Sequence, residues 1–148
     1  MKRNSLIISL LLLPIVLCSG GEIRRYCFDE WCKEIGYSQA VAVDNTLYLS
    51  GIVGEGETME EALTLAVERI DCMLKRFNLD RSCILKEKIY TNDIENLRSA
   101  TYIRKKYYAP YFPAAVWIKT EKKDTSKKWL EVELIVHIPN GHELPEEE

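Results

Sequence analysis

The sequence predicts a two-layer α+β domain in which two helices pack on one face of a mixed β-sheet. Segments in which apolar residues alternate with polar ones are interspersed with segments of helical periodicity, in the order β-β-α-β-α-β-β. Two helices can cover only one face of a sheet, which gives two layers. The 148 residues are enough for one such domain and too few for two.

The first half of the domain is expected to form a hairpin followed by a helix. Asp44-Asn45 is a turn signal between SQAVAV and TLYLSG, two runs typical of strands. Thr58 and Glu61 form a capping box, in which each side chain accepts a hydrogen bond from a free backbone amide. Apolar residues then recur at helical spacing and predict a helix over about 58–77. This stripe consists of Met59, Leu63, Ala66, Ile70, Met73 and Phe77.

The second half adds a strand, a helix and a further strand. Ile84 to Tyr90 has the composition of a strand. Asn92 or Asp93 can cap a second helix over about 94–108, and two prolines follow its end. Ala114 to Thr120 then predicts the next strand, whereas the aromatic segment 22–36 gives no clear prediction.

The last strand, Trp129 to Ile138, shows which side of the sheet faces the helices. Leu130, Val132, Leu134, Val136 and Ile138 share one face, which we expect to pack under the helices. The opposite face carries Glu131 and Glu133 among Trp129, Ile135 and His137. A face that mixes acids with large apolar residues predicts partial cover by a partner subunit, and therefore an oligomer.

The first twenty residues are expected to be a signal peptide. Lys2 and Arg3 precede an uncharged run from Leu6 to Leu17, which has the length of a signal-peptide core and is too short to span a bilayer. Cys18 follows this run directly and suggests a lipoprotein, whereas cleavage after Gly20 is the competing interpretation. Both predict an exported protein, either periplasmic or anchored to a membrane through lipid on Cys18.

Charge and cysteine content limit the function further. The net charge is −3, and loss of Lys2 and Arg3 leaves 18 basic against 23 acidic residues, a net charge of −5. A negative field disfavours general nucleic-acid binding. The domain is expected over 22–139, with an acidic tail over 140–148.

The cysteines show no metal-site spacing, so the sequence predicts no metal. Export would permit a disulfide, for which Cys27 with Cys32 is the favoured pair, while Cys72 and Cys83 can equally be free apolar side chains.

Five motifs follow one another over about residues 35–138: IGYSQAV (35–41), LYLSG (47–51), KIYTND (88–93), YFPA (111–114) and LEVELIV (130–136). This ordered set resembles the Rid family, also called YjgF-like proteins, the imine and enamine deaminases. The resemblance implies a chorismate-mutase-like α+β fold and homotrimers with small-molecule pockets between the subunits. It also implies imine hydrolysis with no cofactor.

The resemblance also assigns site residues by position. It places Glu131 where the family has the glutamate that positions the hydrolytic water, and Thr101 where deaminating members have an asparagine. An arginine that grips the substrate carboxylate normally follows Pro-Ala, but here Pro113-Ala114 is followed by Ala115. An alanine cannot form the bidentate charged contact of a guanidinium. The expected ligand-binding residues are Tyr37, Ser50, Gly51, Ile52, Thr101, Ala115 and Trp117.

Three functions follow as hypotheses. The first is a Rid-like small-molecule-binding protein that does not efficiently deaminate carboxylated imines. The alternative is a hydrolase for an imine or enamine without a carboxylate, with Glu131 activating water; Glu131 can also be a structural residue held by backbone amides. The third and least favoured is an endoribonuclease, because the chain is acidic and has no basic-aromatic stripe.

Overall fold

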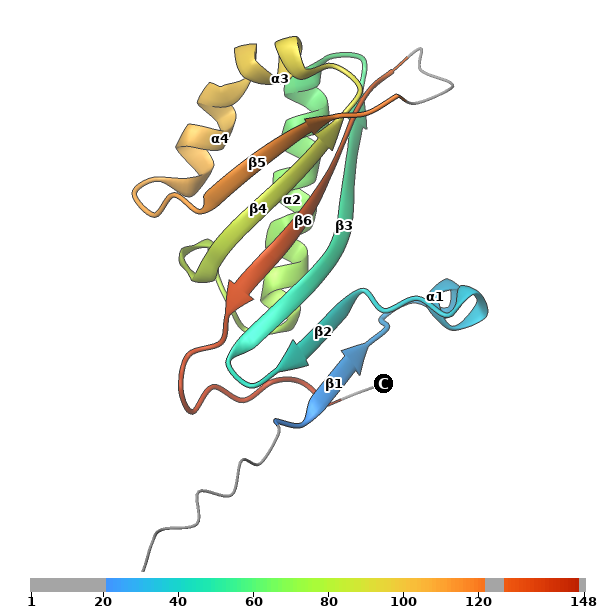
Figure 1. Ribbon diagram of the computed structural model, residues 1–148, viewed down its shortest axis with the longest axis vertical. Helices are drawn as coiled ribbons and strands as arrows, with labels where there is room; N and C mark the ends of the chain where they lie inside the picture. Colours follow the sequence, from blue (N-terminus) through green and yellow to red (C-terminus); the bar gives the residue numbers. More distant parts are fainter. Residues whose placement is uncertain (1–20, 122–126, 147–148) are drawn as a thin grey trace, which may run out of the picture.

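The computed structural model describes residues 21–121 and 127–146, so the expected signal segment with Cys18 lies outside the described residues. The described residues form six strands and four α-helices (Figure 1). In chain order the elements are β1 (Ile23–Tyr26), α1 (Glu30–Ile35), β2 (Ala40–Val43), β3 (Thr46–Gly56), α2 (Met59–Arg76), β4 (Ile84–Thr91), α3 (Ile94–Ser99), α4 (Thr101–Tyr108), β5 (Ala114–Lys119) and β6 (Lys128–His137). A 3₁₀ turn, Arg81–Cys83, precedes β4.

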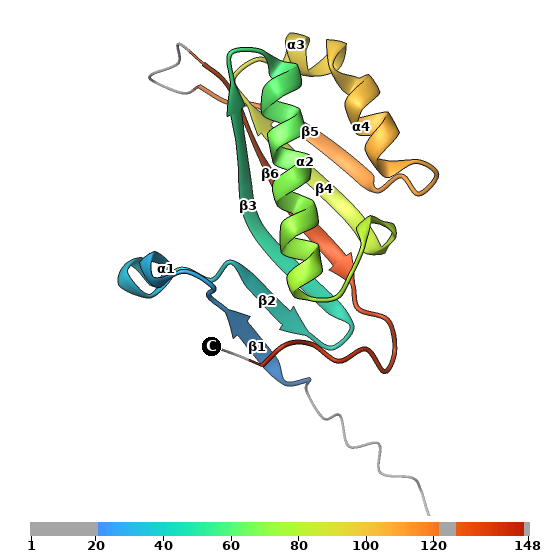
Figure 2. The same ribbon diagram turned by 180° about the vertical axis from the view of Figure 1, so that it is seen from behind.

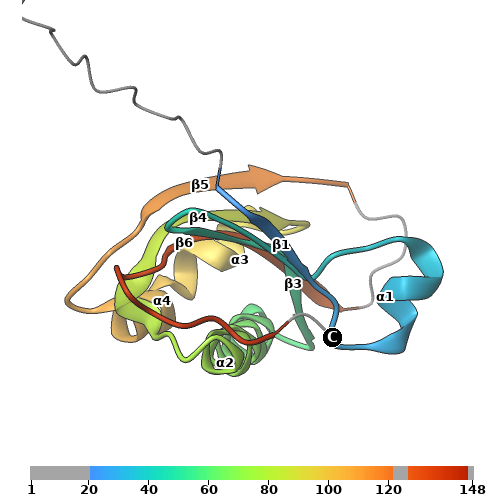
Figure 3. The same cartoon turned by 90° about the horizontal axis from the view of Figure 1, so that it is seen from below.

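All six strands belong to one mixed sheet with the order β1-β2-β3-β6-β4-β5. The β4–β5 pair is parallel and the other pairs are antiparallel. Figure 3 shows α2, α3 and α4 on one side of the sheet, while the opposite side of β3, β6, β4 and β5 carries no helix. The predicted two-layer α+β architecture is confirmed.

Strand β6 has the two faces that its alternation predicts. Leu130, Val132, Leu134 and Val136 are buried on the helix side, whereas the residues between them are less buried. Helix α2 lies very close to β3 at Gly54, because a Cβ placed there would lie 2.1 Å from the Ala62 carbonyl oxygen. The absence of a side chain at Gly54 therefore allows α2 to lie directly on the sheet (Figure 2).

Helix α2 begins with the predicted capping box, in which Thr58 Oγ1 accepts from the Glu61 amide and the Glu61 carboxylate accepts from the Thr58 amide. The second predicted helix is capped by Asp93 but divides at Ala100 into α3 and α4. The Thr101 hydroxyl donates to the Arg98 carbonyl oxygen at 2.8 Å. A side chain that competes for a backbone carbonyl in this way favours such an interruption.

The segment that gave no clear prediction extends the sheet. Strand β1 pairs with β2, and the Tyr26 ring packs edge-on against Phe77 with ring centroids 4.9 Å apart. Helix α1 follows and ends at Gly36, whose φ of 69° is a left-handed conformation that glycine adopts without strain. The described part of the acidic tail, 140–146, returns to β1, where the Tyr26 hydroxyl donates to the Pro145 carbonyl oxygen.

The four described cysteines are free thiols, so the favoured Cys27–Cys32 disulfide is not present in the structure. Partial burial, followed by a contact with Cys32, raises the pKa of the Cys27 thiol above its usual value. Cys32 is fully buried in α1, Cys83 is partly buried and Cys72 is exposed on α2.

Candidate functional site

Four of the predicted site residues meet on the helix-free face of the sheet. Tyr37, Ser50, Gly51 and Glu131 line one hollow of about 550 Å³, named here the Glu131 hollow. Its remaining walls come from β2, β3, β4 and β6. These wall residues are Val41, Tyr48, Leu49, Lys86, Lys88, Glu133, Leu134 and Ile135.

Glu131 lies directly over Gly51 in this hollow. A Cβ placed on Gly51 would be 1.7 Å from Glu131 Oε1, so a side chain at this position would displace the carboxylate. Glu131 is half-buried, and no hydrogen bond or ion pair to its carboxylate is found among the described residues. The backbone-held interpretation of Glu131 therefore has no hydrogen bond to support it within the described chain.

An irregularity in β3 produces this arrangement. The β3–β6 register shifts between Leu49 and Ile52, so Ser50 and Gly51 leave the regular ladder. The Ser50 amide donates to the Gln39 carbonyl oxygen at 3.0 Å, and its hydroxyl donates to the Ser38 carbonyl oxygen at 2.6 Å. Both contacts fix the strand beside the loop that carries Tyr37.

The Glu131 hollow contains balanced charges. Lys88 Nζ lies 3.5 Å from Glu133 Oε2, so two lysines face two glutamates and no guanidinium is present among its lining residues. The Tyr90 side chain and, secondarily, Glu133 raise the pKa of Lys88 above its usual value. Because Glu133 is paired with Lys88, Glu131 is the carboxylate left free for a ligand or a water molecule.

The structure places Ala115 and Trp117 on the other face of the sheet. Strand β5 pairs with β4 so that Ala115 lies beside Glu87 and Trp117 beside Ile89. Trp117 Nε1 donates to Glu87 Oε1 at 3.5 Å, and its ring faces the guanidinium of Arg104 on α4. Within one chain, Ala115 and Trp117 therefore lie on the helix side and not with Glu131.

Thr101 is also separate from the Glu131 hollow, because it begins α4 and its hydroxyl is bonded to the preceding turn.

Glu87 is a buried acid that was not predicted from the sequence. It is 1% exposed and forms an ion pair with Arg104. The signal for Glu87 in the sequence is its position in β4. It alternates with Ile89 and Thr91, whose side chains are buried on the same face.

Comparison with known proteins identifies the family and supports the fold. A family model described as "Endoribonuclease L-PSP" matches residues 32–138. The chain belongs to this family. A structure of a YjgF-family protein from Neisseria meningitidis is similar over 82% of this chain and 99% of that chain, with a TM-score of 0.69 and 22% identity. These findings confirm both the expected Rid/YjgF family and its fold.

Two further relatives carry activity names. The human 2-iminobutanoate/2-iminopropanoate deaminase is 33% identical over 87 residues, which cover 53% of this chain and 63% of that enzyme. The match thus spans less than two thirds of the relative's length. A putative endoribonuclease from Thermotoga maritima superposes with a TM-score of 0.62 at 20% identity over 70% of this chain and 87% of that chain.

A second hollow of this L-PSP family member adjoins the first across β3 and has a volume of about 490 Å³. The predicted residue Ile52 lines this hollow, whereas Tyr37, Ser50 and Gly51 line both hollows. Arg69 and Arg76 on α2 also line it, and neither was predicted from the sequence to be a site residue. Their seven-residue spacing places them on one helical face, beside the apolar stripe, which is a signal that could have found them.

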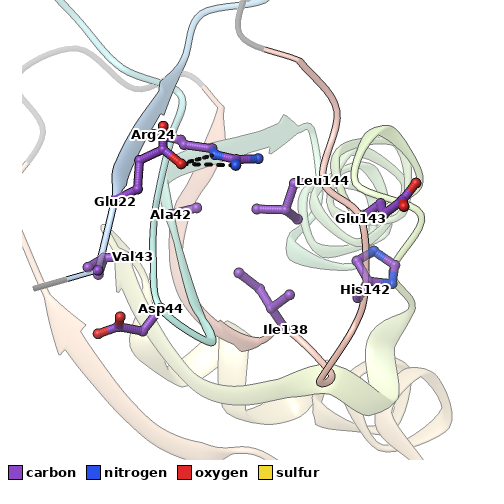
Figure 4. A pocket seen from close by; sticks show the side chains of 10 residues that line it. Glu22, Arg24, Ala42, Val43, Asp44, Ile138, His142, Glu143 and Leu144 are labelled. Carbon is purple, nitrogen blue, oxygen red and sulfur yellow. Dashed lines mark hydrogen bonds and ion pairs between the residues drawn. The ribbon is translucent and has the colours of Figure 1, made fainter. Parts of the chain in front are cut away.

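A third hollow lies between the two ends of the described chain (Figure 4). Its arginine, Arg24, is already paired with Glu22 at 3.0 Å, and the predicted site residues do not line it. We therefore do not assign the function there.

Within residues 21–121 and 127–146, no three His, Cys, Asp or Glu side chains are grouped to hold a metal ion. In the same ranges, no helix has the length and apolar character needed to cross a bilayer.

Proposed function

We propose that this protein binds a small uncharged molecule in the Glu131 hollow and does not efficiently hydrolyse imines that carry a carboxylate. The observation that carries the proposal is the charge arrangement: a free Glu131 carboxylate stands beside a balanced Lys88–Glu133 pair, without a guanidinium. A substrate carboxylate would be repelled by Glu131 and would lack the bidentate partner that makes such contacts strong.

A homotrimer is part of this proposal. The helix-free face exposes Tyr48 (46%) and Val116 (41%), which a neighbouring subunit would cover. Ala115 can approach the Glu131 hollow only from a neighbouring subunit, since the two lie on opposite faces of one chain. Sedimentation velocity should give a mass near three times that of the purified subunit, and a monomer would contradict the proposal.

The deciding experiment measures ammonia release from 2-iminopropanoate by the natural protein, Glu131→Gln and Ala115→Arg. We expect the natural protein and Glu131→Gln to be near the uncatalysed rate, with at most weak activity in Ala115→Arg. A natural rate well above background that disappears in Glu131→Gln would overturn the binding role.

The free carboxylate also favours a second candidate, hydrolysis of an imine without a carboxylate. Glu131 would accept a proton from water as the water oxygen attacks the imine carbon, and would pass this proton to the nitrogen. The hydroxyl of the resulting carbinolamine then loses its proton to the leaving nitrogen as the C–N bond breaks, giving a carbonyl compound and ammonia. The same assay with an uncharged imine tests this role. Turnover that is lost in Glu131→Gln and retained in Glu133→Gln would support it, whereas background rates would exclude it for that substrate.

We also propose export through residues 1–20, with or without lipid on Cys18, because a basic start precedes an uncharged run. The intact mass of the native protein tests both forms. A lipid-sized increase on Cys18 indicates the anchored form, and a chain beginning at Gly21 indicates the free form. An unprocessed chain in the cytoplasm would contradict export.

A further inference from the structure

The second hollow, named here the arginine hollow, has one wall of positive charge. Arg69, Cys72, Met73 and Arg76 come from one face of α2, at spacings of three, four and seven residues. The two arginines are two helical turns apart, about 10.5 Å along the axis. The facing wall is formed by β3 and the segment after β1. Its residues are Asp29, Trp31, Tyr37, Gln39, Ser50, Gly51, Ile52 and Val53.

Both guanidiniums are positioned by contacts that leave their charge unpaired. Arg69 Nη1 donates to the Val53 carbonyl oxygen at 2.7 Å, which leaves its other donors free. The Arg76 guanidinium lies 4.6 Å from the centre of the Phe28 ring. Among the residues that the structure describes, neither arginine forms an ion pair.

The carboxylate in this hollow is already engaged. Asp29 Oδ2 accepts a hydrogen bond from Gln39 Nε2 at 2.9 Å, and Gln39 Oε1 accepts one from the Phe28 amide at 2.7 Å. Two guanidiniums against one bonded carboxylate leave the hollow with net positive charge. Such a site attracts a carboxylate or a similar anion.

The other part of the hollow suits an apolar ring. Trp31 and Tyr37 lie with ring centroids 5.2 Å apart and an interplanar angle of 32°. Ile52, which is largely buried, and Met73, which is half-buried, line the same hollow and add apolar surface. Aromatic faces and a thioether favour contact with a planar ring, while the arginines favour a negative group at its end.

We infer that the arginine hollow, which adjoins the Glu131 hollow, is a binding site for a small aromatic carboxylate. The carboxylate contacts the free donors of Arg69 and Arg76, and the ring contacts Trp31, Tyr37 and Met73. The site goes beyond the proposed function, because its charge favours the class of ligand that the Glu131 hollow disfavours. The two proposals are tested by different measurements, protection of Cys72 here and ammonia release for the Glu131 hollow, so failure of one can be told from failure of the other.

Cys72 provides a direct reporter, since its exposed thiol lies between the two arginines on the wall of the hollow. The full purified protein is alkylated with uncharged iodoacetamide, and the rate at Cys72 is followed by peptide mass spectrometry. With a dissociation constant of about 1 mM, phenylacetate at about 10 mM should slow alkylation roughly tenfold. Phenylacetamide, which has the ring without the charge, and phosphate, which has charge without the ring, should protect much less.

Variants locate the effect. Arg76→Gln should remove most of the protection, and Arg69→Lys should weaken it, because lysine keeps the charge but loses the planar fork. Arg98→Gln on α3 is the matched control, since Arg98 is exposed and lies outside the hollow. In Arg98→Gln, phenylacetate should protect Cys72 as strongly as it does in the natural protein. Alkylation at Cys83, remote from the hollow, is the internal control and should be unchanged by phenylacetate.

Four results would overturn the inference. One is no slowing at Cys72 by phenylacetate in the natural protein, a result that needs no variant to fold. Another is equal protection by phenylacetamide, which would remove the role of the arginines. The third is equal slowing of alkylation at Cys83, and the fourth is full protection retained in Arg76→Gln.

Discussion

Glu87 and Glu131 lie on neighbouring strands of one sheet but on opposite faces, and their surroundings differ completely. Glu87 is 1% exposed, is paired with Arg104 and also accepts from Trp117. Glu131 is half-buried over Gly51 and is not paired among the described residues. An acid that is buried with its partners supports the fold, whereas an acid left free in a hollow is available to a ligand.

Two buried tyrosines on the helix side, Tyr107 and Tyr108, also lie beside carboxylates. Burial, and then the Glu87 carboxylate, raise the pKa of Tyr108 well above its usual range. Burial and a hydrogen bond to Asp71 do the same for Tyr107. Both tyrosine hydroxyls therefore stay neutral at ordinary pH values.

The largest expected effect is on stability. Glu87→Ala or Arg104→Ala should each lower the free energy of unfolding by about 3–5 kcal/mol, since each leaves a buried charge unpaired. Glu131→Gln should change it by less than about 0.5 kcal/mol. Urea unfolding measures all three. Replacing both Glu87 and Arg104 by Met should recover most of the loss, and equal effects at Glu87 and Glu131 would remove the distinction drawn between them.

Two glycines of β3 offer the next test. Gly54→Ala should cost about 1–3 kcal/mol, because its Cβ would meet the Ala62 backbone. Gly51→Ala should cost less, because its Cβ meets only the movable Glu131 side chain. Urea unfolding of both variants checks the order. A larger loss for Gly51→Ala would mean that the Glu131 position supports the fold.

Asp93 is an intermediate case, an acid near the surface that has partners. Hydrogen bonds from Lys128 and Asn96 lower its pKa from 3.8 to about 2. Its stabilising contribution is therefore present above pH 3.8 and is lost as pH falls through about 2. Asp93→Asn should cost at most about 1 kcal/mol at pH 7 and much less near pH 2. Unfolding measured at both pH values decides this, and an equal cost at both would contradict the assignment.

The smallest effect is expected at Ala115. Because Ala115 is exposed on the edge strand, Ala115→Arg should change the free energy of unfolding by less than about 0.5 kcal/mol. Thermal unfolding of this variant beside Ala114→Arg checks the expectation. A large loss would show that Ala115 packs in the assembled protein.

Several features were predictable from the sequence because they are local. The alternation in β6 and the capping box of α2 depend on residues a few positions apart, and the motif order identified the family. The four residues Tyr37, Ser50, Gly51 and Glu131 were also predicted, and the structure brings them together. The segment carrying β1 and α1 could not be predicted, since its strand is formed by pairing with β2 and not by a pattern of its own.

Other features were decided only by the tertiary structure. The sequence determined that Ala115 and Trp117 share a face, because alternate residues of a strand point the same way. Which face that is depends on the parallel pairing of β5 with β4, which places them beside Glu87 and away from Glu131. The tertiary structure also places Glu131 over Gly51, although the two lie far apart in the chain. It likewise places Arg69 and Arg76 in the walls of the same hollow as Trp31. Strand alternation is a property of neighbouring residues, but a site is formed where elements pack.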